Sequence, residues 1–184
     1  MIASLDDAWQ WYEGVKSLAG WMARMGRKYW EHPELASMLG RDNHFRDVEK
    51  DEIARREKCV SADLDDLCVL LLFSVFEAIV RERALADVNT ELPSARHPAL
   101  KHALKTLHES LEHGSFAKVL EAFKELDSSL VEQVAQVRKY RNWVAHGRGG
   151  DQPDEAVDPQ TAYQRLQRFL TLMATVENTP PRES

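Results

Sequence analysis

The sequence predicts an all-α fold, a helical bundle of about five to seven helices. Apolar residues recur every three or four positions along most of the chain, and no segment alternates as a β-strand would. Of the 184 residues, 43% are hydrophobic and 29% charged, which is the composition of an ordinary globular domain. No repeat or long linker divides the chain, so one packed domain is expected.

The first predicted helix covers residues 5 to 30, and Pro33 and Gly40 mark the connection after it. Its apolar residues fall mostly at helical spacing: Leu5, Trp9, Val15, Leu18, Trp21, Met22 and Met25. The charged segment 45–60 is expected to form a shorter, exposed helix. The tryptophans are expected mainly in the core or in dimer contacts.

A long helix is expected to begin at Ser61 as its N-cap and to run to about Val88. Three acids suit its positive N-terminal end: Asp63, Asp65 and Asp66. Residues 67 to 80 are the most apolar stretch, too short to span a bilayer, and are expected to lie buried at the centre. Glu77 within this stretch needs a partner, either Arg81 one turn later or Arg138 or Arg141 across helices.

Caps and breakers place the remaining helices. Pro98 suits the first position of a helix that Gly114 closes. Ser115 caps a helix to residue 126, and Asp127 to Ser129 form the cap region of the next helix, which reaches residue 147. The last helix covers residues 159 to 178, with one apolar face: Tyr163, Leu166, Leu170 and Met173.

Charge and cysteine content limit the classes of function. The 24 Lys and Arg against 30 Asp and Glu leave a net charge of −6, so any nucleic-acid site must be local. The acidic N-terminus lacks the features of a signal peptide. Cys59 and Cys68 are expected to be free thiols, and the protein is expected in the cytoplasm, without a membrane partner.

The sequence "RKYRNWVAHGRGG", residues 138 to 150, is the strongly basic part of this acidic chain. Helical periodicity places one set of residues toward the bundle: Leu130, Val134, Val137, Tyr140 and Val144. It places a second set on the opposite side: Arg138, Arg141, Asn142, Ala145 and His146. Lys139 and Arg148 add positive charge nearby.

An Arg and a His on one helix face suit phosphodiester cleavage. The Arg fork matches a phosphate, and the His titrates near neutral pH. RNA supplies its own nucleophile, the 2'-hydroxyl, so no metal or cofactor is required. Because base and acid are two roles, a symmetric dimer would supply the second His.

"RNWVAH", Arg141 to His146, resembles the signature of the HEPN superfamily (higher eukaryotes and prokaryotes nucleotide-binding). In that family an Arg, usually followed by a polar residue, precedes a His by four to six residues. The resemblance covers roughly residues 61 to 178. Residues 1–60 would be a family-specific helical extension packed on the same domain, and 179–184 a disordered tail.

The resemblance implies a homodimeric, metal-independent ribonuclease, a toxin or defence effector with RNA as substrate and an antitoxin or other neutralising protein as partner. By position, Arg141 would hold the scissile phosphate, Asn142 would orient it, and His146 would be the acid or base. Arg138, Lys139 and Arg148 would bind RNA, and Glu77 would support the site. The alternative is a non-catalytic HEPN-like module that binds a nucleotide, RNA or protein.

Other patterns carry less weight. Arg27 to His32 repeats the Arg and His spacing but contains bulky and acidic residues. Arg148 occupies the place of a Tyr that is modified in one toxin–antitoxin branch, so that form of regulation is not expected. The acidic loop 151–158 is either a solvated loop or an RNA mimic that shields the site. The four His between 97 and 113 are spaced wrongly for a helical metal pair, so no metal is expected.

Overall fold

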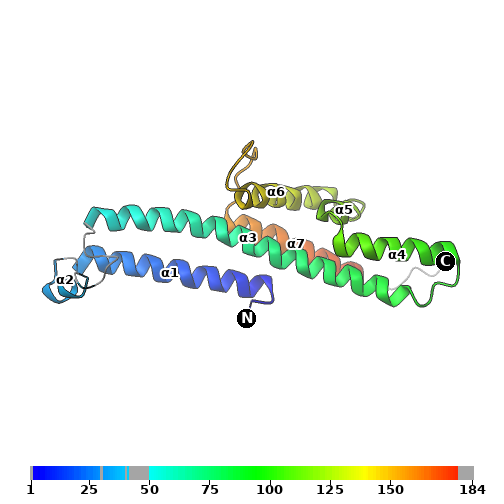
Figure 1. Ribbon diagram of the computed structural model, residues 1–184, viewed down its shortest axis with the longest axis horizontal. Helices are drawn as coiled ribbons and strands as arrows, with labels where there is room; N and C mark the ends of the chain where they lie inside the picture. The colour runs from blue at the N-terminus through cyan, green and yellow to red at the C-terminus, as the bar shows by residue number, and fades with distance from the viewer. Residues whose placement is uncertain (1, 30, 40, 42–49, 178–184) are drawn as a thin grey trace.

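The computed structural model describes residues 2–29, 31–39, 41 and 50–177. These residues form helices and connections without any β-strand, which confirms the all-α prediction (Figure 1). The seven helices of the described chain are α1 (Leu5–Tyr29), α2 (Pro33–Leu39), α3 (Lys50–Glu91), α4 (Pro98–His113), α5 (Phe116–Glu121), α6 (Ser128–Ala145) and α7 (Pro159–Glu177).

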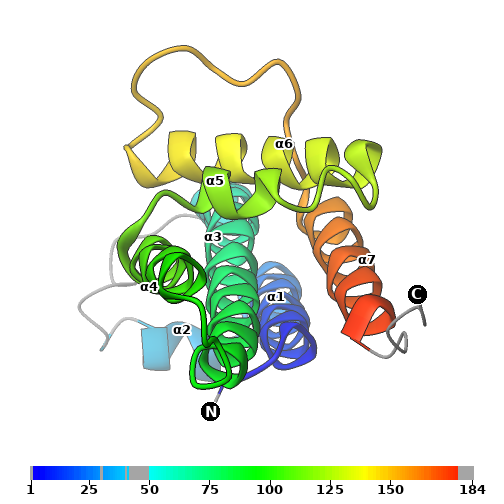
Figure 2. The same cartoon turned by 90° about the vertical axis from the view of Figure 1, so that its right-hand side faces the viewer.

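Helix α3 is the axis of the bundle, because α1, α4, α6 and α7 all pack against it. Figure 2 looks along α3 and shows α6 crossing over it, with α1 and α7 beside it. The face of α3 toward the core is fully buried at Cys68, Val69, Leu72, Phe73, Phe76 and Val80. Phe76 meets Phe116 of α5 and Phe169 of α7 edge-on, at centroid distances of 5.8 and 5.4 Å. One face of the apolar stretch 67–80 is therefore the buried centre, as predicted, while Leu67 at its start is exposed.

The predicted helix start at Ser61 is wrong, because α3 is continuous from Lys50 to Glu91. Ser61 lies in its interior, and the residue 60 boundary falls inside one helix. The acids expected to face a positive helix end have other partners: Asp65 bonds to groups of α1, and Asp66 to groups of α6 and its following loop. Contacts with other helices therefore account for Asp65 and Asp66 at these positions, without a helix N-terminus nearby.

The predicted apolar face of α1 divides into a covered and an uncovered part. Leu5 is buried, and Trp9 and Val15 pack against the core. The later apolar side chains are exposed: Leu18, Trp21, Met22 and Met25. The reason is visible in Figure 1, where α1 and the first turns of α3 project beyond α6 and α7.

The later helices begin close to where their caps predict. Asp127 accepts a hydrogen bond from the Leu130 amide at 2.9 Å and starts α6. Pro98 starts α4, and Gly114 ends it with its amide bonded to the Ser110 carbonyl at 2.9 Å. Helix α5 is shorter than predicted, since it ends at Glu121 and the chain after it forms turns.

Both cysteines are free, Cys59 exposed and Cys68 buried. Burial raises the pKa of the Cys68 thiol to about 12. Within the described part of the chain, no helix has the length and apolar character needed to cross a membrane.

Candidate functional site

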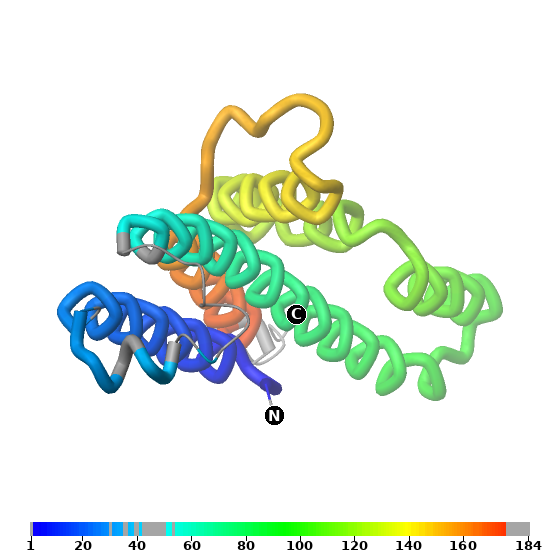
Figure 3. Tube along the Cα trace, turned by 60° about the vertical axis from the view of Figure 1, so that its left-hand side comes forward, coloured from blue at the N-terminus to red at the C-terminus, as the bar shows by residue number. Residues whose placement is uncertain are grey.

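The basic segment lies on α6 and on the loop that follows it, which rises away from the bundle before α7 begins (Figure 3). Most of the core side of α6 matches the prediction: Leu130, Val134 and Val137 are buried, and Tyr140 packs against the core. Val144, the last residue of that predicted set, is only half-buried. Ala145 and His146 are exposed at the helix end.

Arg141 departs from the predicted arrangement, because its side chain turns inward. Its Nη2 lies 2.8 Å from a carboxylate oxygen of Glu77, and its Nη1 donates to the Asn142 side-chain oxygen at 3.1 Å. The guanidinium also stacks on Phe73, with 4.8 Å between its central carbon and the ring centroid. Its Nε is buried and has no hydrogen-bond partner. Glu77, on α3, therefore competes with any phosphate for this guanidinium and at the same time fixes its position.

Glu77 connects Arg141 to a second arginine. Its other carboxylate oxygen accepts from Arg81 at 2.9 Å, one turn later on α3. Arg81 also donates to the carbonyl of Leu111 and, at 2.9 Å, to that of Gly114, which fixes the end of α4. Of the three arginines that the sequence offers as partners of Glu77, Arg81 and Arg141 both pair with it, and Arg138 does not.

His146 is the C-cap of α6, with φ −90° and ψ 21°. Its backbone amide donates to the Asn142 carbonyl at 3.0 Å, and its side chain is exposed. Among the described residues, no acid forms an ion pair with the imidazole. Its ring can therefore meet a ligand directly, and the neighbouring Ala145 leaves room for close approach.

The side chain of Arg148 lies against two acids of α3, Asp63 and Asp66. It has a positive φ of 59°, an uncommon conformation for a residue with a Cβ. Its guanidinium pairs with Asp66 of α3, lies 3.9 Å from Asp63, and sits 6.0 Å from the Trp143 ring centroid. The predicted RNA-binding role of Arg148 therefore requires that this ion pair open.

Asp66 also accepts a hydrogen bond from the Tyr140 hydroxyl at 2.7 Å. Burial and this hydrogen bond raise the pKa of Tyr140 to about 12. Asp66, Tyr140, Trp143 and Arg148 line part of a cavity of about 440 Å³ between α3, α6 and the loop. The indole Nε1 of Trp143 is buried without a partner.

Arg138 and Lys139 are the cations of this helix that no described acid neutralises. Lys139 is exposed. Arg138 is half-buried, and its Nε is buried without a hydrogen-bond partner. Together with His146 they are the part of the basic segment still open to an anion.

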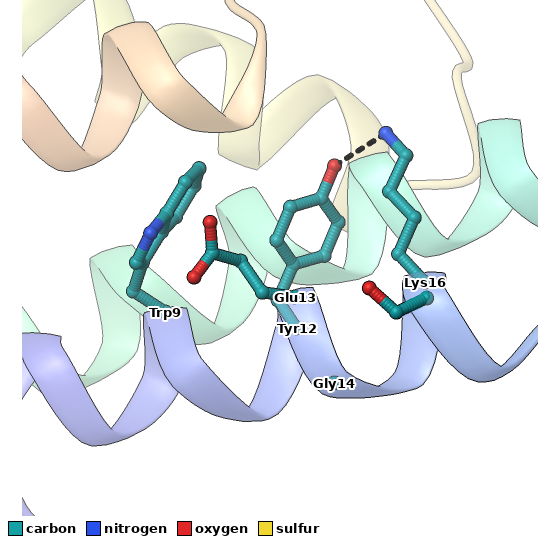
Figure 4. A pocket seen from close by; sticks show the side chains of 6 residues that line it. Trp9, Tyr12, Glu13, Gly14 and Lys16 are labelled. Carbon is teal, nitrogen blue, oxygen red and sulfur yellow. Dashed lines mark hydrogen bonds between the residues drawn. The ribbon is translucent and has the colours of Figure 1, made fainter.

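Asp65 mirrors Asp66 on the neighbouring position of α3. It accepts from the Tyr12 hydroxyl at 2.6 Å and from Lys16 at 2.7 Å, which fastens α1 to α3. Figure 4 shows Tyr12 and Lys16 joined by a 2.6 Å hydrogen bond at a hollow of about 580 Å³ that Trp9 and Glu13 also line. The sequence offered no signal for these tyrosine contacts, because the partners lie 53 and 74 residues apart.

Several of the remaining candidates have structural partners. Arg27 of the second Arg and His pattern pairs with Glu57 at 2.7 Å. In the acidic loop, Glu155 pairs with Arg165 at 2.7 Å, and Asp158 caps α7 through the Thr161 amide at 3.0 Å. Within the described residues, no three His, Cys, Asp or Glu side chains are grouped to hold a metal ion.

Comparisons of the chain with protein-family models, with curated proteins and with solved structures find no match.

Proposed function

We propose that the chain is a HEPN-type, metal-independent RNA endonuclease that works as a homodimer. The observation that carries the proposal is the combination on α6 of an exposed, unpaired His146 with an Arg141 whose guanidinium is fixed by Glu77, Asn142 and Phe73. Fixed cations and an accessible imidazole are what a pre-organised phosphate site needs.

The reaction uses the RNA 2'-hydroxyl as nucleophile. A base removes the hydroxyl proton, the oxygen attacks the adjacent phosphorus, and the bond to the 5'-oxygen breaks as an acid protonates that oxygen. The products are a 2',3'-cyclic phosphate and a 5'-hydroxyl. His146 of one copy takes the proton and His146 of the partner supplies one, while Arg141 stabilises the charge on the phosphate.

Arg138 and Lys139 would contact the neighbouring phosphates, and Arg148 would join them once it leaves Asp66. A cellular role as a toxin or defence effector, held in check by a neutralising protein, follows from the same proposal.

The test is cleavage of an end-labelled, mixed-sequence RNA in excess chelator. The natural protein should cleave and leave cyclic phosphate ends, and His146→Ala should lower the rate by about 10²–10⁴. His113→Ala is the matched control, because His113 is also an exposed histidine at the end of a helix, α4. Equal loss in both variants, or no loss in His146→Ala, contradicts the proposed role.

A second candidate function is a non-catalytic module that binds RNA, a nucleotide or a protein on the same surface. The observation that favours it is that Arg141 and Arg148 are both paired with acids of the same chain. A binder would lose affinity in Arg141→Ala and keep it in His146→Ala, whereas the enzyme would lose cleavage in both.

A further inference from the structure

Helix α1 carries a row of exposed apolar side chains on the side that the bundle leaves uncovered. Trp11, Leu18, Trp21 and Met25 follow the alternating three- and four-residue spacing of a coiled-coil seam, with Gly14 between Trp11 and Leu18. They are 43%, 63%, 55% and 38% exposed, and the adjacent Met22 is 63% exposed. These five apolar residues and Gly14 are called the α1 stripe.

The α1 stripe is distinct from the face that α1 already buries. At about 100° per residue, the stripe spans roughly 100°, and its centre lies roughly 120° around the helix from the buried face. That buried face consists of Leu5, Ala8, Tyr12 and Ala23. A soluble surface helix needs one apolar face, and α1 has two.

The position of α1 leaves the stripe accessible. The second half of α1 lies in the projecting part of the molecule, with α3 as its main neighbour (Figure 1). Contiguous exposed apolar side chains of this kind mark interaction surfaces.

We propose that the α1 stripe binds the same stripe of a second copy of this chain, with the two α1 helices antiparallel. The stripe runs from residue 11 to residue 25, so full overlap of two antiparallel stripes puts the two-fold axis beside Leu18. The two Leu18 side chains then meet at the axis. Trp11 of each copy faces Met25 of the other, a sulfur–aromatic contact.

Shape supports this pairing. In the same register Gly14 faces Met22, so a residue without a side chain lies opposite a long and flexible one. A Cβ added at Gly14 would meet no atom within 4 Å, so the space at this position is open in the single chain. The partner's Met22 side chain fills that space.

Charge supports the antiparallel direction and a second copy as the occupant. Of the charged residues on α1, Asp7 in the first turn and Lys28 in the last turn lie next to the stripe by helical periodicity. Two antiparallel copies place Asp7 of one beside Lys28 of the other at both ends of the stripe, whereas parallel copies would align like charges.

This interface is separate from the one that the proposed ribonuclease site needs. Figure 2 shows α6 and α1 on different sides of α3, so a contact through α1 lies away from the helix that carries Arg141 and has His146 as its C-cap. A chain with both interfaces assembles as four copies when the two two-fold axes cross at a right angle, and a chain with the α1 interface alone assembles as two.

The first test is the molar mass by light scattering of the natural protein, of Leu18→Glu and of Leu107→Glu. Leu18→Glu puts two carboxylates together at the axis and should halve the mass, whether from four chains to two or from two to one. Leu107 is an exposed leucine on α4, so Leu107→Glu should keep the natural mass. A monomeric natural protein, or a Leu18→Glu protein of unchanged mass, overturns the proposal.

The second test fixes the direction without disturbing the seam's charge. In a Cys59→Ser background, Trp11→Cys and Met25→Cys proteins are treated with a short thiol-to-thiol crosslinker, singly and mixed. Cys68 is fully buried and should not react. The mixture should crosslink and the single proteins should not, because antiparallel Trp11 positions lie about 21 Å apart. Crosslinking of each variant to itself shows a parallel pair and overturns the proposed arrangement. The expected loss of RNA cleavage in His146→Ala does not depend on either result, so the two proposals fail separately.

Discussion

At the residue scale, Glu77 determines where the Arg141 guanidinium lies. A carboxylate in an apolar helix predicts a nearby cation, and the sequence limits the choice to three arginines. It cannot predict that the carboxylate takes two of them, because the Arg141 contact joins residues 64 positions apart and depends on how α6 crosses α3. The same limit explains why Arg141 was expected on the solvent side: periodicity gives the angle of the Cα and leaves the path of a long side chain open.

Replacing Glu77 by Gln tests whether this carboxylate positions Arg141. The neutral side chain keeps its size and loses both ion pairs, so we expect the free energy of unfolding to fall by about 1.5–3 kcal/mol. RNA cleavage should fall by about tenfold or more, with a smaller change in RNA affinity. Urea unfolding and cleavage kinetics measure the two effects. Glu82→Gln, at an exposed position of the same helix, is the control. Unchanged cleavage in Glu77→Gln would show that Arg141 needs no such support.

Tyr140 gives the protein a predictable alkaline response. Its pKa is raised from 10.0 to about 12 in the folded chain, so the unfolded chain loses the phenol proton first. The stabilising effect is complete below about pH 10 and is lost as the pH rises toward 12. In Tyr140→Phe, the fall of the unfolding free energy between these pH values should be shallower than in the natural protein. Parallel curves from chemical unfolding at each pH would contradict this assignment.

At the scale of elements, caps predicted helix ends where the local sequence alone decides them. Asp127 and Gly114 are such cases, since their bonds reach only three or four residues along the chain. Ser61 failed for the opposite reason. Its serine and the acids after it have the composition of a helix start, but Asp65 and Asp66 serve tyrosines of α1 and α6, which local composition cannot reveal.

Gly114 follows α4 and contacts Arg81, the arginine that shares Glu77 with Arg141. The space around its Cα leaves no room for a side chain. A Cβ at this position would lie 2.3 Å from the Ser110 carbonyl oxygen, so the backbone must shift. Gly114→Ala should lower the free energy of unfolding by about 1–3 kcal/mol. It should also weaken cleavage, because the Gly114 carbonyl holds Arg81, which shares Glu77 with Arg141.

Gly20→Ala is the matched control for Gly114→Ala. Its added Cβ would meet only Arg24 Nη1, at an ordinary 3.8 Å, within helix α1. In Gly20→Ala the free energy of unfolding, measured by thermal unfolding, should rise by about 0.5–1 kcal/mol. A Gly114→Ala protein as stable as the natural chain would show that the close contact relaxes without cost.

At the scale of the whole molecule, the proposed RNA site belongs to an acidic protein and has few cations. The net charge of −6 and the internal pairs of Arg141 and Arg148 leave Lys139 as an exposed positive contact on α6. The composition predicts that any nucleic-acid site must be local, and it cannot show that acids of α3 pair with part of the basic segment.

Lys139→Ala should reduce the steepness with which salt weakens RNA binding. Each lost phosphate contact lowers the slope of log affinity against log salt by about 0.7 for single-stranded RNA. Lys105→Ala, at an exposed lysine of α4, should keep the natural slope. Fluorescence anisotropy with labelled RNA over a salt series measures both, and equal slopes in all three proteins would remove Lys139 from the binding surface.

The unbroken α3 also determines how the protein moves through solution. Its 42 residues make a rod about 63 Å long, whereas a compact chain of this length has a radius of gyration of about 16 Å. Friction along such an axis makes the protein sediment more slowly, and leave a sizing column earlier, than a sphere of equal mass. On a sizing column a single chain will therefore elute like a globular protein of larger mass. The number of copies has to be determined by a measurement of mass that does not depend on shape.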